Sequence, residues 1–155
     1  MLRKLVTALF AMAAIAGVHF VAVANENGSA DEAKIMVEKA FTLVSKEGKE
    51  KAYEAFNDPN GGFKDRDLYV FIIALNDGVV QAHGANKALI GKSLLNVKDG
   101  DGRLFIQDMI ALAKGEGTGW IDYKWPNPTT KKVEPKSSYV KKFDDVLVGV
   151  GIYKG

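Results

Sequence analysis

Two aromatic residues and a lysine in one segment are the side chains of this sequence best suited to bind a small molecule. Tyr123 and Trp125 are two residues apart in a β-favouring stretch, so they share one face of a strand. A turn at Pro126-Asn127-Pro128 returns the chain to a second extended run, which carries Lys136 and Tyr139. Two rings beside an ammonium and a phenol predict a pocket for a small anion with an apolar end.

Each of these residues also has an ordinary structural explanation. Aromatic residues of a hairpin often form the hydrophobic core, and Tyr139 could be such a residue with a bonded hydroxyl. Lys136 could be one more solvated lysine, like Lys124, Lys131, Lys132, Lys141 and Lys142. Because Lys136 and Tyr139 are three residues apart, they reach one pocket only through a bulge or a twist in the strand.

A second hairpin adds three candidate ligand-binding residues. Tyr69 and Phe71 share a face of its first strand, and His83 ends its second strand. If these rings and those of the first hairpin line one cavity, they set the size of the ligand and exclude water; otherwise they are core. A neutral His83 could bond a ligand carboxyl or hydroxyl group, or be a bonded residue at a strand end. A lone histidine predicts no metal site.

Composition excludes several classes of protein. The chain has 155 residues, 47% hydrophobic and 26% charged, as expected for one globular domain. It has no cysteine, so it has no disulfide framework, thiolate metal site, covalent haem attachment or thiol nucleophile. Neither a G-x-S-x-G nor a G-x-G-x-x-G motif is present. We therefore predict no enzymatic activity and no cofactor.

The N-terminus has the pattern of an export signal. Arg3 and Lys4 precede an apolar run over residues 5–23, and Ala22-Val23-Ala24 forms an A-x-A cleavage site. We predict a signal peptide over residues 1–24 and a periplasmic domain over residues 25–155; the alternative is an uncleaved membrane anchor. Removing Arg3 and Lys4 from the 21 basic residues leaves 19, against 19 acidic residues. A neutral mature domain predicts no nucleic-acid partner.

The order of elements follows from periodicity and turn residues. Residues 29–32, Ser-Ala-Asp-Glu, have the form of a capping box that begins a helix. Helical spacing continues to Phe56, as one long helix or as two helices interrupted near Gly48. The run 68–75 and residues 79–83 form a hairpin around an Asn-Asp-Gly turn. The remaining elements are a short helix over 86–90, an amphipathic helix over 104–114, the hairpin of Tyr123 and Lys136, and a strand over 146–153.

These elements predict an α+β fold. Strands joined by tight turns are antiparallel, so we expect a PAS-like five-stranded antiparallel sheet with a long N-terminal helix and short connecting helices. We expect the helices to cover one face of that sheet.

From about Asp31 to Tyr153, the sequence resembles the single Cache domains, PAS-like sensor modules found outside the cytoplasmic membrane of bacteria and archaea. The resemblance depends on the joint order of several short motifs. They are Tyr69-Val70-Phe71, Asp77-Gly78, Ala82-His83, Gly91-Lys92-Ser93-Leu94, Asp101-Gly102, the run 119–126 (GWIDYKWP), Pro135-Lys136-Ser137-Ser138-Tyr139-Val140 and Gly149-Val150-Gly151-Ile152-Tyr153.

The resemblance implies a sheet that holds a small ligand, often a short organic acid, against its connecting segments. On this basis we expect Lys136 to bind the ligand carboxylate. Many relatives are fused to a membrane signalling protein, whereas this sequence ends at Gly155, two residues past the last strand. We therefore expect a free-standing exported binding protein that presents a small organic acid to a membrane signalling partner. The alternative is an interaction module, in which the N-terminal helix forms a homodimer or contacts a membrane protein.

Overall fold

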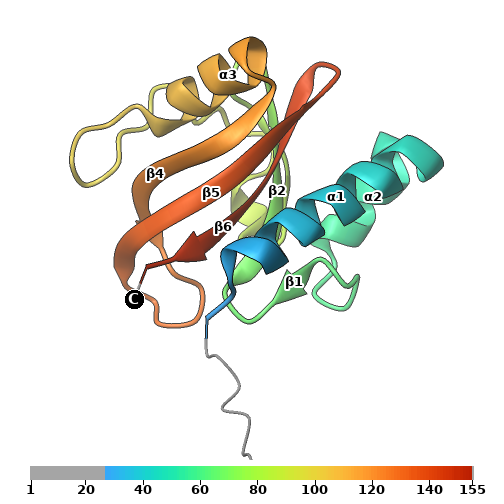
Figure 1. Cartoon of the computed structure of the whole chain (residues 1–155), viewed down its shortest axis with the longest axis horizontal. Coiled ribbons are helices and arrows are strands. Elements are labelled where there is room, and N and C mark those ends of the chain that lie inside the picture. The colour runs from blue at the N-terminus through green and yellow to red at the C-terminus, as the bar shows by residue number, and fades with distance from the viewer. Residues whose placement is uncertain (1–26, 155) are drawn as a thin grey trace, which may run out of the picture.

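The computed structural model of the chain describes residues 27–154. The predicted signal peptide, residues 1–24, lies outside this range. Within residues 27–154 the fold consists of three α-helices, a short 3-10 helix and six strands (Figure 1). In chain order they are α1 (Ala30–Glu47), α2 (Lys49–Asn57), β1 (Lys64–Asp65), β2 (Leu68–Ala74), β3 (Val80–His83), η1 (Lys87–Leu89), α3 (Phe105–Gly115), β4 (Thr118–Pro126), β5 (Val133–Phe143) and β6 (Val146–Tyr153).

All strand pairs are antiparallel, in the order β1-β2-β6-β5-β4, with β3 also paired to β2. The last strand of the chain, β6, therefore lies in the middle of the sheet. The α+β antiparallel sheet predicted from the sequence is confirmed, with strands β2 to β6 where the five strands were expected. The two-residue β1 adds a sixth strand that turn-rich residues 57–65 did not reveal.

The N-terminal helical segment consists of two helices that break at Gly48. Ser29 caps α1, with its side chain accepting from the Glu32 amide while the Glu32 carboxylate accepts from the Ser29 amide. Gly48 has a φ of 82°, a conformation that glycine adopts without strain and that ends the helix. Buried residues of both helices, such as Val37 and Phe56, pack on the sheet face formed by Val70, Ile72 and Val148.

The opposite face of the sheet is covered as well. Phe105, Met109 and Ile110 of α3 pack against a second set of sheet residues, which includes Phe71 and Leu147. Figure 1 shows α1 and α2 on one side of the sheet and α3 across the other. The expectation that helices cover one face is therefore wrong. The physical reason is visible in β2, whose seven residues are all buried, because a strand covered on both faces has no polar alternation.

The α3 side of the sheet carries the connecting segments. Residues 84–104 run from β3 to α3 and include η1, close to the short helix expected over residues 86–90. Among residues 27–154, no helix is both long and apolar enough to cross a membrane. The two faces of the sheet are thus unequal: paired helices seal one, whereas one helix and a long connection cover the other.

Candidate functional site

The sheet brings six of the seven predicted ligand-binding residues to its α3 face. Tyr69 and Phe71 come from β2, and His83 lies opposite Phe71 on β3. Tyr123 and Trp125 come from β4, and Tyr123 lies opposite Lys136 of β5. The residues are Tyr69, Phe71, His83, Tyr123, Trp125 and Lys136.

Tyr139 is the residue that the structure does not bring to this cluster. Pairing of β5 with β4 and β6 continues without a register shift from Lys136 to Tyr139, so the bulge that would unite the two side chains is absent from these strands. Tyr139 therefore points to the face covered by α1 and α2, where its ring lies 5.4 Å from that of Trp120. The prediction that Tyr139 shares a pocket with Lys136 is therefore wrong.

Lys136 is a buried cation inside a cage of aromatic rings. It is 1% exposed, and its Nζ donates a hydrogen bond of 2.6 Å to the Tyr69 hydroxyl oxygen. Nζ lies 3.9 Å from the ring centre of Tyr69 and 4.8 Å from that of Tyr153. Among residues 27–154, no carboxylate lies within salt-bridge distance of it. Burial holds the pKa of Lys136 well below its ordinary value, and the more distant charge of Asp67 offsets only part of that shift.

A glycine of the central strand makes room for this lysine. A Cβ atom placed on Gly151 would lie 2.1 Å from Cε of Lys136 and 2.4 Å from Oγ of Ser138. One on Gly149 would lie 2.2 Å from the ring of Phe71. The two glycines of β6 therefore form the floor on which the lysine stem and the phenylalanine ring lie.

The ammonium group of Lys136 lies within 6.0 Å of the ring centres of Tyr69, Tyr123 and Tyr153. The Tyr153 hydroxyl donates to the carbonyl oxygen of Pro126 at 2.7 Å, and the Tyr123 hydroxyl pairs with Ser138 Oγ at 2.9 Å. The hydroxyl oxygens of Tyr69 and Tyr153 are 3.4 Å apart. Burial raises the pKa of each of the three phenols, so they stay protonated and act as neutral hydrogen-bonding groups.

His83 is a neutral hydrogen-bond donor toward the site. Its Nδ1 accepts from the backbone amides of Ala85 at 3.3 Å and Asn86 at 3.0 Å, which places the ring proton on Nε2. Burial, and then the charge of Lys136, lower the pKa of His83 to about 3. Nε2 has no hydrogen-bond partner among the residues that the structure describes, so its proton is available to a ligand.

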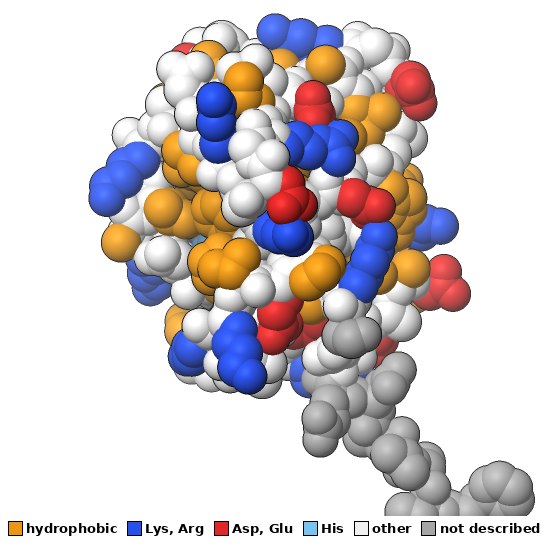
Figure 2. Space-filling model, turned by 90° about the vertical axis from the view of Figure 1, so that its left-hand side faces the viewer, with side chains coloured by type: hydrophobic (Ala, Val, Ile, Leu, Met, Phe, Trp, Pro, Cys, Tyr) orange, Lys and Arg blue, Asp and Glu red, His pale blue; other side chains and the backbone are white. Residues whose placement is uncertain are grey.

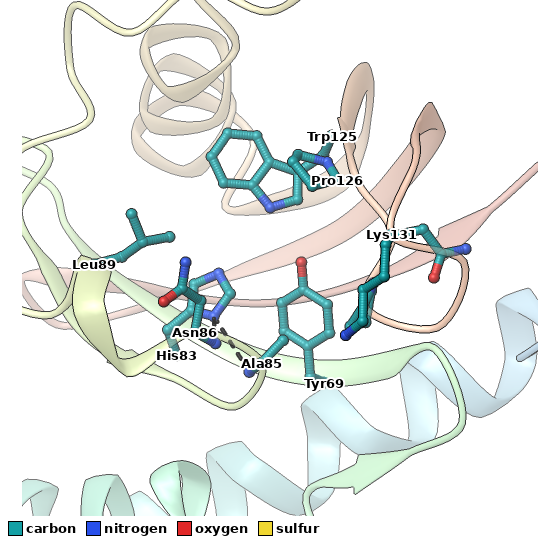
Figure 3. A pocket seen from close by; sticks show the side chains of 10 residues that line it. Tyr69, His83, Ala85, Asn86, Leu89, Trp125, Pro126 and Lys131 are labelled. Atoms are coloured by element: carbon teal, nitrogen blue, oxygen red, sulfur yellow. Dashed lines mark hydrogen bonds between the residues drawn. The ribbon is translucent and has the colours of Figure 1, made fainter.

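A cavity of about 400 Å³ opens beside Tyr69 and His83 (Figure 3). Trp125 and Pro126 of β4 cover one side, and Leu89 closes another. This volume lies within the range of small-molecule sites, roughly 300–1,000 Å³. Figure 2 views the molecule from the left-hand side of Figure 1 and shows several hydrophobic side chains gathered between separate lysine and arginine side chains. The cavity is a mostly apolar space with a few polar atoms on its wall.

Lys136, Phe71 and Tyr123 do not line this cavity but lie deeper. A second void of about 20 Å³, enough for one water molecule, lies between Phe71, Tyr123 and Met109. The ring of Tyr123 stacks on that of Phe105, with centres 4.6 Å apart. Tyr69 lines both spaces and bonds Lys136, so it connects the open cavity with the buried ammonium group.

The sequence did not single out four residues of this site. Tyr153 lies opposite Lys136 in the register of β6 and forms part of its cage. Phe105 stacks on Tyr123, and Asn86 and Lys131 line the cavity from the connecting loops. Tyr153 could have been found from its place at the end of an apolar strand, whereas the loop residues carry no periodic pattern. Within residues 27–154 there is no group of three potential metal ligands, and the prediction of no metal stays a prediction.

Solved structures with a similar fold include proteins of chemotaxis. A methyl-accepting chemotaxis protein from Vibrio parahaemolyticus matches at a TM-score of 0.68 and 25% identity, over 79% of this chain and 86% of that one. A periplasmic sensor domain of a chemotaxis protein matches at 0.65 and 25% identity, over 81% and 90% of the two chains. A structure described as the basis for carboxylic acid recognition by a Cache chemosensory domain matches at 0.67 and 25% identity, over 81% and 92%.

The family model described as "Cache domain" matches residues 20–154. The chain belongs to the Cache domain family. This Cache domain is also 32% identical over 91 residues to the methyl-accepting chemotaxis protein McpP of Pseudomonas putida, and 34% identical over 90 residues to the sensor histidine kinase MctS of Rhizobium johnstonii. Each match covers 57% of this chain but only 16% and 19% of those proteins. The chain is thus similar to one part of a chemotaxis receptor and of a sensor histidine kinase, and its family is one of extracellular sensor domains.

Proposed function

We propose that this Cache domain is an exported sensor module that binds a small carboxylate on the α3 face of its sheet and does not change it chemically. One observation carries the proposal: Lys136 is a buried ammonium group with no carboxylate partner among the described residues, one hydrogen bond away from an open cavity. A buried charge with no carboxylate in direct contact is unfavourable, and the more distant charge of Asp67 offsets only part of that cost, so a ligand anion would supply a direct partner.

The hydrogen bonds around Tyr69 explain how the cavity could present that charge to a ligand. Because Lys136 Nζ donates to the Tyr69 oxygen, the Tyr69 hydroxyl can donate its own proton. The Tyr153 hydroxyl donates to Pro126, so its oxygen accepts the Tyr69 proton through a long bond of 3.4 Å, which a closer carboxylate would replace. A carboxylate in the cavity would accept from the Tyr69 hydroxyl and from Nε2 of His83. Each bond of such a chain polarises the next, which strengthens anion binding in a partly dry site.

A thermal-shift screen tests this function. Short carboxylic acids are compared with their amides, which have a similar shape but no charge. A bound acid at about 100 times its dissociation constant adds about 2.7 kcal/mol to the free energy of unfolding, whereas the matched amide adds little. Lys136→Met removes the effect, and Lys142→Met, an exposed position of the same strand, keeps it. If no acid stabilises the purified domain, the proposed function is wrong.

Export and signalling complete the proposal. The apolar N-terminal run and the periplasmic sensor domain among the similar structures support export. The receptor and kinase relatives support a membrane signalling partner for the occupied domain. The mass of the protein isolated from its source tests cleavage after Ala24 and the free-standing state together. A mass that retains residues 1–24 would contradict cleavage.

A homodimer through the N-terminal helix stays a prediction. Ile35 of α1 is 68% exposed, but a single exposed apolar residue is common on monomeric proteins. Sedimentation of the domain and of Ile35→Glu would test this prediction, because a dimer through α1 would dissociate in the variant.

A further inference from the structure

A second lysine reaches the same cavity from a different element. Lys131 lies in the loop between β4 and β5 and lines the cavity together with Tyr69 and His83. Figure 3 shows its side chain extending toward Tyr69 on the side away from His83 and Asn86. The cavity wall therefore presents neutral donors at one end and an ammonium group at the other.

The loop that carries Lys131 is fixed by buried Asn127. The backbone of Asn127 donates to the carbonyl oxygen of Lys132 at 2.8 Å and accepts from the amide of Lys131 at 2.9 Å. Its side chain, in a residue that is 1% exposed, accepts from the Thr129 amide and donates to Glu134. These bonds hold Lys131 at a φ of 64°, a left-handed backbone conformation. The backbone position from which the Lys131 side chain extends is thus fixed by the loop.

Lys131 forms no ion pair or side-chain hydrogen bond within residues 27–154, and its charge is available to a ligand. Glu134, at the start of β5 and the acid nearest to Lys131 in the sequence, accepts from Asn127 Nδ2 at 2.7 Å and from Thr130 Oγ1 at 2.5 Å. No described residue on the cavity wall is acidic. The ammonium group of Lys131 thus lines the cavity without an ion-pair partner in the described chain, and that of Lys136 lies deeper, behind Tyr69.

The volume of the cavity exceeds the need of the smallest acids. A water molecule occupies about 30 Å³ in the liquid, so an acid of five non-hydrogen atoms fills at most about 150 Å³. The cavity of about 400 Å³ leaves room for a longer ligand that reaches from His83 and Tyr69 to Lys131. Such a ligand would gain a second charge-assisted bond only if its far end is also anionic.

We propose that Lys131 is a second anion-binding residue, which makes the domain selective for small dicarboxylates over monocarboxylates. This inference rests on the proposed function, since one carboxylate must first bind at Tyr69 and His83. The second carboxylate then pairs with Lys131 at the cavity wall. Because Lys131 is exposed, the pair is partly screened, and its contribution to affinity is moderate.

The test compares acids of equal carbon number by calorimetric titration at neutral pH: succinate with butyrate, and malonate with propionate. The full domain, Lys131→Met and Lys132→Met are titrated with each acid. Lys132 is the matched control, because it is the next residue, is also exposed and does not line the cavity. We expect the domain and Lys132→Met to bind at least one dicarboxylate roughly three- to tenfold more tightly than its partner acid.

The outcomes separate the two proposals. In Lys131→Met the preference for the dicarboxylate disappears while monocarboxylate affinity is unchanged, and added salt weakens the preference in the unmodified domain. Monocarboxylates that bind as tightly as dicarboxylates, or a preference that survives Lys131→Met, would overturn the role of Lys131 and leave the proposed function standing. If none of the four acids binds, the selectivity is refuted, and the wider acid screen decides the proposed function.

Discussion

Replacing Lys136 with methionine separates stability from function at this site. Methionine has a similar length but no amine to keep out of water, so the substitution removes the unfavourable burial of that group. Burying a polar group that lacks full compensation costs about 2–3 kcal/mol. The substitution also removes the hydrogen bond to Tyr69, which contributes about 1 kcal/mol. We therefore expect Lys136→Met to raise the free energy of unfolding by about 1–2 kcal/mol.

Denaturant and thermal unfolding measure this change. For a domain of this size, each kcal/mol raises Tm by about 3–5 °C. The same variant should lose carboxylate binding, because binding depends on the buried charge that methionine lacks. Lys142→Met, on an exposed position of the same strand, should change neither property. A Lys136→Met protein that unfolds more easily by about 2 kcal/mol or more, and still binds the acid, would show that Lys136 is a structural residue.

The pH dependence of stability gives an independent check. The pKa of Lys136 is lower in the folded than in the unfolded domain, where it is near 10.4. Between those two values the unfolded chain holds the extra proton, so this residue makes stability rise with pH. The raised tyrosine pKa values act only above about pH 10. Unfolding of the domain and Lys136→Met at increasing pH, up to about pH 10, should show the rise in the domain alone; equal slopes would contradict the reasoning.

Three further predictions concern the surroundings of the lysine. Gly151→Ala places a methyl group against Cε of Lys136 and should lower stability by about 1–3 kcal/mol and weaken acid binding, whereas Gly115→Ala, with no atom within 4 Å, should do neither. In NMR titrations the His83 ring should stay neutral down to about pH 3, and a titration midpoint near pH 6.5 would show that the ring is not buried. The free energy of unfolding should fall on acidification below about pH 6.5, by up to about 1.4 kcal/mol per pH unit. Ser29→Ala removes the helix cap and should cost about 1 kcal/mol in denaturant unfolding without changing acid affinity; an unchanged midpoint would mean that the cap adds no stability.

Much of the fold could be predicted because its signals are local. The capping box at Ser29, the glycine break at Gly48 and the alternation of β4 each need only neighbouring residues. The apolar run of β2 was also recognised, but its full meaning was missed. A strand apolar at every position requires cover on both faces, and α3 supplies the second cover.

The site could be predicted only in part, because it depends on contacts between distant strands. The alternation of side chains along β4 correctly placed Tyr123 and Trp125 on one face of the sheet. The same alternation along β5 places Tyr139 on the face opposite to Lys136. Nothing local distinguishes Lys136 from the solvated lysines around it. Its burial follows from β6, which places Tyr153 opposite it and Gly151 beneath its stem.

The loop residues of the site were beyond sequence reasoning. Lys131 reaches the cavity because Asn127 fixes the backbone of the β4–β5 turn, and no periodic pattern records such an interaction. The same holds for Asn86, whose backbone N–H donates to Nδ1 of His83 and so leaves the ring proton on Nε2.

A crystal structure of the domain with a stabilising carboxylic acid tests the central claim most directly. We predict that one carboxylate lies in the cavity within about 3 Å of the Tyr69 hydroxyl and Nε2 of His83, with Nζ of Lys136 bonded to Tyr69 or to the ligand itself. An acid bound elsewhere, with this cavity empty at saturating concentration, would contradict the account.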